Sequence, residues 1–469
     1  MNKKQELALF FTPDSLAILG SFKENYFGGF VVVKSLLEAG YAGRIYPVNP
    51  GYKTVLGRDV HPSLESLPEV PDLVLIMINA RAVPAVLESC GDKGVKAVVV
   101  VADGFAERDR DGARLQEEIL SIARDRGIRI IGPNTAGVVN PFVGFNPCPY
   151  DAGYYRLKPG PIAVCSQTGM INPQAFPYLD LTFGVSKICD LGNKSDVDEC
   201  DLLPYLGEDE QTGVISLYVE SVRDGRRFMQ AAREVTPKKP VLILKLGRTE
   251  AGAKASASHT GSMAVNDRIF EAAANQAGLL RLDKFRELFE IPKIFASQPL
   301  PNGNRLAIMS YTGGIGVLAT DESPRYGLRL ARASQGTRAA LEDLFPGLGT
   351  IPIDIGPMMA AVKDHFELYP SILRTLVEDE SVDVLFNVLW TGAGEDKLDR
   401  YLEAYESIRD SCSTPIATWI YGPQSRLNRE LARRVEELGF PVFEEPETCI
   451  KALGLAYQYT RIQARGRPQ

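Results

Sequence analysis

Ile162-Ala-Val-Cys-Ser-Gln-Thr-Gly-Met-Ile171 is matched later in the chain by Leu306-Ala-Ile-Met-Ser-Tyr-Thr-Gly-Gly-Ile315. Each stretch begins with apolar residues typical of a buried strand, continues with Ser-x-Thr-Gly, and leads into a segment that we expect to be helical. An internal repeat of this kind predicts two homologous flavodoxin-like parallel sheets. Further strands of the two units are expected at residues 213–219, 240–245, 383–389 and 415–420.

The first 150 residues alternate between short apolar strands and helical segments. Strands are expected at residues 15–19, 44–48, 72–78, 97–101 and 128–131, with helices at 30–39, 82–90 and 111–124. This alternation predicts a parallel sheet covered on both faces, in which ligands bind at the carboxyl ends of the strands. Small and polar residues follow every predicted strand: Gly20-Ser21, Asn49-Pro50, Asn79-Ala80, Asp103-Gly104-Phe105 and Gly132-Pro133-Asn134.

The turn after the first strand lacks the G-x-G-x-x-G fingerprint of dinucleotide-binding proteins. Asn49-Pro50 also stands after the second strand, where an acidic residue would bind a ribose hydroxyl. A nicotinamide or flavin site, and with it an oxidoreductase, is therefore disfavoured. A phosphate group at the helix N-terminus remains compatible with the sequence, and so does an ordinary strand-to-helix turn without a ligand.

Composition excludes several classes of protein. The net charge is −7 over 469 residues and no Lys/Arg-rich block occurs, which argues against nucleic acid as a partner. The apolar runs are too short for a membrane span, and no signal peptide is recognised. Seven scattered cysteines and three histidines offer no zinc cluster, so we expect no metal site and a cytoplasmic protein with free thiols.

One histidine stands apart, in Lys254-Ala-Ser-Ala-Ser-His-Thr-Gly261. The small residues around His259 allow a phosphate or another backbone to approach closely. An imidazole that titrates near neutral pH can attack phosphorus. From these residues alone, a loop histidine without a chemical role is equally compatible.

Several motifs, in this order, resemble the NDP-forming acyl-CoA synthetases, the superfamily of succinyl-CoA synthetase. The chain looks like the alpha subunit of the ADP-forming acetyl-CoA synthetase type. The motifs span nearly the whole chain: Tyr46-Pro-Val-Asn-Pro50, Gly132-Pro-Asn134, Ser166-Gln-Thr-Gly169, Gly192-Asn-Lys-Ser-Asp196, Tyr218-Val-Glu-Ser-Val-Arg-Asp-Gly-Arg-Arg-Phe228, Leu244-Lys-Leu-Gly-Arg248 and Ala257-Ser-His-Thr-Gly261.

The resemblance implies an α/β protein with a Rossmann-like CoA-binding domain at 1–150 and flavodoxin-like domains at 151–298 and 299–469. It implies that His259 is transiently phosphorylated and that Glu220 orients its imidazole. Amides of the two repeated turns would bind the phosphate, and the dipoles of two helix N-termini would favour it there. The residues concerned are Ser166, Gln167, Thr168 and Gly169 in the first turn, and Ser310, Thr312, Gly313 and Gly314 in the second.

The CoA site implied for the first domain lies at the strand ends. We expect its pyrophosphate near Gly20, its adenosine near Asn49, and Lys53 as a charged contact to phosphate. The full set of expected CoA contacts is Gly20, Ser21, Val48, Asn49, Pro50, Lys53, Ile78, Asn79, Gly104, Phe105 and Asn134.

The chain contains no Walker A motif, and we find no ATP-grasp pattern in it. The resemblance therefore implies a separate ATP-grasp beta subunit that holds ATP or ADP with Mg²⁺, in a heterodimer or heterotetramer. The expected substrate is a small carboxylic acid whose identity stays open, as does the preference for ADP or GDP. The alternative function is a non-catalytic module that senses CoA or acyl-CoA.

Overall fold

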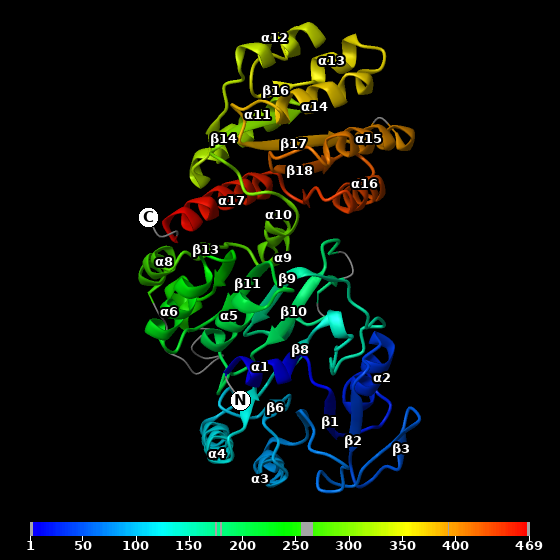
Figure 1. Cartoon of the computed structure of the whole chain (residues 1–469), viewed down its shortest axis with the longest axis vertical. Helices are drawn as coiled ribbons and strands as arrows, with labels where there is room; N and C mark the ends of the chain where they lie inside the picture. The colour runs from blue at the N-terminus through cyan, green and yellow to red at the C-terminus, as the bar shows by residue number, and fades with distance from the viewer. Residues whose placement is uncertain (1–2, 174–175, 179–180, 255–265, 393, 467–469) are drawn as a thin grey trace. The chain divides into compact units, whose positions relative to one another are not determined.

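The computed structural model describes residues 3–173, 176–178, 181–254, 266–392 and 394–466. The chain divides into two compact units, one ending at Leu288 and the other beginning at Phe289 (Figure 1). The first unit holds two main parallel sheets and the second unit holds one. The α/β class with Rossmann-like and flavodoxin-like domains is confirmed, whereas the domain boundaries at 150 and 298 remain a prediction.

The first sheet has the strand order β2-β1-β5-β6-β7, and all its pairs are parallel. Because the chain moves from β1 outward to β2 and then returns to β5 on the other side of β1, the strand order reverses between β1 and β5. Ligands of doubly wound sheets bind at such a reversal. The strands are β1 (Ser15–Gly20), β2 (Arg44–Val48), β5 (Leu73–Met77), β6 (Ala97–Val100) and β7 (Arg129–Ile131), with β3 (Thr54–Val55) and β4 (Arg58–Asp59) as a small hairpin.

The helices of this sheet form where the sequence predicts them: α2 (Gly29–Ala39), α3 (Val83–Lys93) and α4 (Arg110–Arg126). Each ends at a glycine in the left-handed conformation, which a glycine adopts without steric cost. The N-terminal helix α1 (Lys3–Phe11) packs on the second sheet's domain, where Phe11 stacks on Tyr205 with ring centroids 5.2 Å apart. The two domains of the first unit therefore share one hydrophobic core.

The second sheet has the order β13-β12-β11-β9-β10-β8. Its parallel strands are β9 (Pro159–Ser166), β10 (Val185–Asp190), β11 (Val214–Val219), β12 (Val241–Lys245) and β13 (Leu280–Arg281). The edge strand β8 (Val138–Val139) comes from the chain that leaves the first sheet, and it pairs antiparallel with β10. The helices are α5 (Glu199–Glu208), α6 (Gly225–Val235) and α8 (Asp267–Gln276).

The segment after β9 departs from the prediction. Ser166-Gln-Thr-Gly169 was expected to open an α-helix, but the described residues form only the 3₁₀ turn η3 (Gly169–Ile171). Pro173 follows within the expected helix, and a proline pushes the residue before it out of helical geometry.

The second unit contains a sheet of order β15-β14-β17-β18-β19, with β16 also paired to β14. Leaving the edge strand β8 aside, the second and third sheets follow the same order, in agreement with the internal repeat. The strands are β14 (Arg305–Ser310), β15 (Arg329–Leu330), β16 (Ile353–Asp354), β17 (Val384–Trp390), β18 (Ile416–Tyr421) and β19 (Val442–Phe443). The main helices are α9 (Glu287–Glu290), which spans the division between the units, α10 (Pro292–Ser297), α11 (Gly313–Glu322), α12 (Gln335–Leu344), α13 (Gly356–Ala361), α14 (Tyr369–Val377), α15 (Leu398–Ile408), α16 (Ser425–Glu437) and α17 (Pro446–Gly466).

No helix in the described part of the chain is both long and apolar enough to span a membrane.

Candidate functional site

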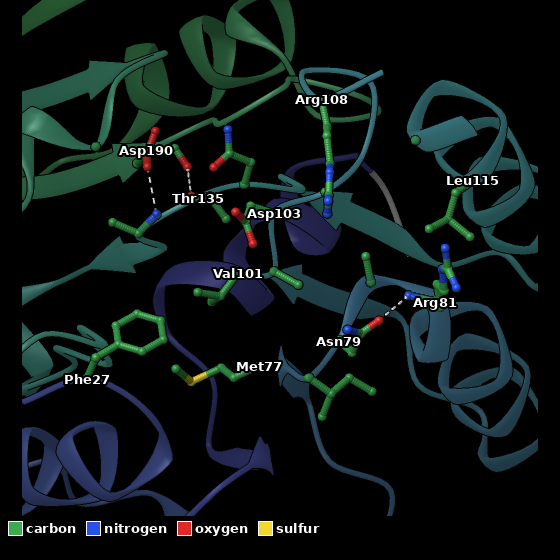
Figure 2. A pocket seen from close by; sticks show the side chains of 18 of the residues that line it. Phe27, Met77, Asn79, Arg81, Val101, Asp103, Arg108, Leu115, Thr135 and Asp190 are labelled. Atoms are coloured by element: carbon green, nitrogen blue, oxygen red, sulfur yellow. Dashed lines mark hydrogen bonds between the residues drawn. The ribbon is translucent and has the colours of Figure 1, made fainter. Parts of the chain in front are cut away.

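A cavity of about 1160 Å³ in the first unit is lined both by expected CoA contacts and by expected phosphate contacts of the first Ser-x-Thr-Gly turn. Its walls come from the carboxyl ends of β5 and β6, the segment after β7, and the turn after β9. Figure 2 shows Asp190 and Thr135 on one side of this cavity and Asn79 and Arg81 on the other. The lining includes seven of the predicted residues: Ile78, Asn79, Gly104 and Asn134 from the expected CoA contacts, and Gln167, Thr168 and Gly169 from the expected phosphate contacts.

A smaller cavity of about 230 Å³ lies where the strand order reverses. Asn49 shapes it, because its side-chain amide donates to the carbonyl of Gly20 at 2.8 Å and its Oδ1 accepts from the Gly51 amide at 2.8 Å. Five expected CoA contacts line this second cavity: Gly20, Val48, Asn49, Pro50 and Ile78. A Cβ atom at Gly20 would stand 3.2 Å from the Cβ of Met77, so the close packing of β1 on β5 favours glycine there.

Three expected CoA contacts line neither cavity. The hydroxyl of Ser21 lies 3.1 Å from that of Tyr52, and the Lys53 side chain is exposed. Phe105 follows a strand end as predicted, but its ring is fully buried in the core of the first domain. Arg81 and Arg108, which line the large cavity, were not predicted.

Glu107 fixes the turn that carries Gly104. Its Oε1 accepts from the amides of Gly104 at 2.6 Å and Phe105 at 3.0 Å, while its Oε2 accepts from the side-chain amide of Asn193 at 2.5 Å. Asn193 belongs to the loop after β10, so this side chain links the second domain to the predicted CoA turn. The contacts of Glu107 follow no periodic pattern in the sequence, so the sequence does not reveal them.

The first Ser-x-Thr-Gly turn is held by a hydrogen bond within the turn and by another to strand β11. Ser166 Oγ accepts from the Thr168 amide at 2.8 Å, and the Gln167 amide donates to the carbonyl of Tyr218 at 3.2 Å. Two of the amides expected to hold phosphate are therefore bonded to protein in this structure. The Gln167 side chain points to the next strand, where its Oε1 accepts from the amides of Glu220 at 2.6 Å and Ser221 at 3.0 Å.

Glu220 stands directly after β11 and is 9% exposed. The hydroxyl of Tyr218 donates to its Oε1 at 3.1 Å. Burial, reinforced by the Glu220 carboxylate, raises the pKa of the Tyr218 phenol, which keeps this hydroxyl a donor. The carboxylate is thus held near the Gln167 turn, although the sequence placed the two 53 residues apart.

Asp190, at the end of β10, is a buried carboxyl in the wall of the large cavity. Its Oδ2 accepts from the Ala136 amide at 2.6 Å and its Oδ1 from the Gly192 amide at 3.1 Å. Burial raises the pKa of Asp190 to about 6, against the opposing effect of these amide bonds. Its strand mixes polar and apolar residues, so no apolar run marks this strand in the sequence.

The second Ser-x-Thr-Gly turn lies in the second unit, beside a separate cavity of about 300 Å³. Ser310 Oγ accepts from the Thr312 amide at 3.1 Å, as in the first turn. Gly313 and Gly314 are the first residues of α11, where helix geometry leaves the amides without an intrahelical acceptor. Ser310, Thr312 and Gly313 line this cavity together with Asp354.

His259 lies outside the described residues, and its role remains a prediction. Among the residues that the structure describes, no cluster of three or more His, Cys, Asp or Glu side chains could hold a metal ion.

Comparison with known proteins follows the same division of the chain. Residues 14–141 match the family described as CoA binding domain, and residues 159–295 match the succinyl-CoA ligase like flavodoxin domain. The chain is 35% identical to the alpha subunit of acetate–CoA ligase [ADP-forming] I from Pyrococcus furiosus, over 98% of this chain and 99% of that subunit.

Two further relatives extend the comparison. A 4-hydroxybutyrate–CoA ligase [ADP-forming] from Nitrosopumilus maritimus is 33% identical over 96% of this chain, which covers 64% of that longer protein. The solved structure of a dinucleotide-forming acetyl-coenzyme A synthetase 1 from Ca. Korarchaeum cryptofilum, in complex with phosphate and ADP, is 27% identical. It aligns with a TM-score of 0.87 over 98% of each chain.

Proposed function

The chain belongs to the ADP-forming acetyl-CoA ligase family as an alpha-subunit-like member, and from this premise we propose that it is the alpha subunit of an acyl-CoA ligase. In the direction of synthesis, this enzyme converts a carboxylic acid, CoA and ATP to acyl-CoA, ADP and phosphate. The reaction is reversible and passes through an acyl phosphate and a phosphohistidine.

In the reverse direction, the reaction starts from the thioester. A phosphate oxygen attacks the acyl carbon of acyl-CoA, the C–S bond breaks, and the thiolate leaves and takes up a proton. A ring nitrogen of His259 then attacks phosphorus, and the bond between phosphorus and the acyl oxygen breaks to release the carboxylate. Finally, a terminal oxygen of ADP takes the phosphoryl group, which restores the free imidazole and gives ATP.

Each step sets a requirement for the protein. The imidazole must be neutral to attack, and a carboxylate that accepts a hydrogen bond from its other nitrogen fixes the tautomer. We assign this role to Glu220, whose backbone and carboxylate are both held by neighbouring groups. The phosphoryl oxygens need hydrogen-bond donors, and we assign this role to the turn after Ser166, which lines the large cavity of the first unit.

The observation that carries the proposal is the large cavity of the first unit. Residues of both matched domains line this one cavity. Gly104 and Asn134 come from the domain matched as CoA-binding, and Gln167 and Gly169 come from the domain matched as succinyl-CoA ligase-like. A thioester bound at the first domain would then reach the turn proposed to hold phosphate.

We place the nucleotide and Mg²⁺ on an ATP-grasp partner subunit. The chain covers 99% of a relative named as an alpha subunit but only 64% of the longer 4-hydroxybutyrate–CoA ligase, and the remaining part of that ligase would correspond to the partner. The acid is a small carboxylic acid, for which acetate and 4-hydroxybutyrate are the candidates that the relatives suggest.

The test uses the isolated full chain. It is incubated with ³²P-labelled phosphate and a panel of acyl-CoA thioesters, including acetyl-CoA, 4-hydroxybutyryl-CoA and an aromatic acyl-CoA. We expect acid-labile, base-stable label on the protein with at least one thioester, and none in His259→Asn. CoA affinity, measured by calorimetry, should be the same in the variant and the wild type.

Other results would overturn the proposal. CoA binding without any label across the panel would favour the sensing module instead. Label of unchanged rate in His259→Asn would exclude the phosphohistidine. Turnover of ATP to acyl-CoA by the single chain would exclude the assignment of the nucleotide to a partner.

A further inference from the structure

A buried ion pair lies in the loop between β10 and α5. The ammonium group of Lys194 donates to Oε2 of Glu199 at 2.8 Å, and both side chains are only 1% exposed. The same ammonium group donates to the backbone carbonyl of Ser221 at 2.6 Å. Lys194 therefore reaches from the loop after β10 to the residue that follows Glu220.

This contact completes a clamp on the backbone around Glu220. Gln167 Oε1 accepts from the amides of Glu220 and Ser221, and Lys194 Nζ donates to the next carbonyl. Three consecutive peptide groups are thus fixed from two neighbouring loops. A carboxylate on a backbone held in this way has only its own side-chain torsions left to vary.

A lysine at position 194 carries two free-energy costs in the folded state. A buried ion pair must overcome the desolvation of both charges, and well-packed apolar residues often stabilise a fold equally well. The backbone of Lys194 also has φ of 51°, a left-handed conformation that costs a non-glycine residue free energy. What distinguishes Lys194 from a merely structural buried lysine is therefore its bond to the Ser221 carbonyl, next to Glu220.

The surroundings show what holds the lysine. Glu199 is in the first turn of α5, whose N-terminus is capped by Asp198 through the amides of Cys200 at 2.8 Å and Asp201 at 3.3 Å. On the other side, the Arg223 guanidinium donates to the carbonyls of Asn193 at 3.0 Å and Ser195 at 3.3 Å. The loop that carries Lys194 is therefore anchored at both of its neighbours.

We propose that Lys194 is a positioning residue for phosphoryl transfer, which sets the direction of the Glu220 carboxylate by holding the carbonyl of Ser221. The proposal rests on the role of Glu220 proposed above. Without the lysine, the amides of Glu220 and Ser221 keep their bonds to Gln167, but the Ser221 carbonyl loses this donor. The backbone that directs the Glu220 carboxylate is then held at two peptide groups instead of three, and the carboxylate loses part of the fixed geometry that an orienting group needs.

The experiment is a double-mutant cycle on the full chain. The initial rate of protein labelling by ³²P-phosphate is measured with the acyl-CoA that labels the wild type fastest. The variants are Lys194→Met, Glu220→Gln and the two combined. We expect Lys194→Met to slow labelling by about tenfold to a hundredfold, but by less than about twofold when Glu220 is already changed to Gln.

The matched control is Lys187→Met. Lys187 is also 1% exposed, and its ammonium group donates to Asp209 at 3.0 Å and Gln211 at 2.7 Å, without a contact to the Glu220 segment. Loss of a buried lysine there should leave the labelling rate within about twofold of the wild type once the fraction of folded protein is taken into account. CoA affinity should stay unchanged in both lysine variants.

If Lys194→Met does not fold, Lys194→Met combined with Glu199→Met takes its place in the cycle, because it leaves no unpaired buried charge. Equal losses with Glu220 present and absent, or no loss at all, would overturn the positioning role while His259→Asn still abolishes labelling. Label that survives in His259→Asn would instead refute the proposed function.

Discussion

The turns after β9 and β14 carry the same Ser-x-Thr-Gly motif, and in both the serine hydroxyl accepts from the threonine amide, at 2.8 Å and 3.1 Å. The two turns differ in the residue between the serine and the threonine, which is Gln167 in the first turn and Tyr311 in the second. Gln167 reaches across to the backbone of Glu220, whereas Tyr311 points into an aromatic core and accepts a hydrogen bond from the Tyr401 hydroxyl at 2.8 Å. One turn is tied to the proposed orienting residue Glu220 and the other to the packing of its unit.

The segments after the two turns also differ. The first continues as the 3₁₀ turn η3 and the second as the ten-residue helix α11. A shared motif therefore fixes the strand end and its first hydrogen bond, while the residues around it decide what the turn supports. If this distinction is correct, equivalent substitutions in the two turns should have unequal effects.

The largest effect is expected for Gln167→Ala. The change leaves two buried amides, those of Glu220 and Ser221, without their acceptor, and each unpaired group costs about 1–3 kcal/mol. We expect the free energy of unfolding in urea to fall by about 3 kcal/mol and ³²P labelling to slow at least about tenfold. The exposed Gln230→Ala, on α6, is the control and should change stability by less than about 0.5 kcal/mol.

The second effect depends on pH and on Asp190 beside the first turn. Because its folded pKa of about 6 lies above that of an unfolded aspartate, the folded state holds the proton more tightly. Asp190 therefore contributes full stability below about pH 4, and this contribution is lost as the pH rises through about 6, a change of about 3 kcal/mol.

Asp190→Asn has no such titration. The difference in unfolding free energy between wild type and variant should shift by about 3 kcal/mol between pH 3 and pH 7, with the wild type losing stability as the pH rises. Urea unfolding at four or five pH values measures it. A difference that stays constant with pH would contradict the assignment of this pKa to Asp190.

The smallest effect is expected for Tyr311→Phe in the second turn. It removes one buried hydrogen bond, but the Tyr401 hydroxyl keeps the carbonyl of Trp390 at 3.1 Å as an acceptor. Thermal or urea unfolding should show a loss of about 1 kcal/mol, and labelling should stay within about twofold of the wild type. A loss of labelling as large as that of Gln167→Ala would remove the distinction between the two turns.

The sequence predicted those parts of the fold that depend on local patterns. Apolar runs such as 97–101 and left-handed glycines such as Gly40 located strands and helix ends within a few residues. The helix expected after Ser166 was wrong because Pro173 interrupts it. Strand β10 was not predicted, since Lys187 and Asp190 interrupt its apolar pattern and find their partners only in the folded chain.

For the candidate site, the rule that ligands bind at strand ends located Ile78, Asn79, Gly104 and Asn134 on one cavity. The same rule says nothing of side-chain direction, and the Phe105 ring turned out to lie in the core. The contacts of Gln167 and Lys194 join side chains to the backbone of distant residues. Such contacts follow no sequence period and no compositional bias, so only the folded structure reveals them.

The short strand β8 restricts where this chain can be divided into separate domains. It supplies the outer hydrogen-bonding partner of β10, through Val138 and Val139, before the chain has entered the domain whose sheet it completes. A gene cut near residue 150 would separate β8 from β10 and leave β10 as an uncovered sheet edge, open to pairing with other chains. We therefore expect chimaeras between relatives to fold when the first two domains are exchanged together, with the break point near residue 288.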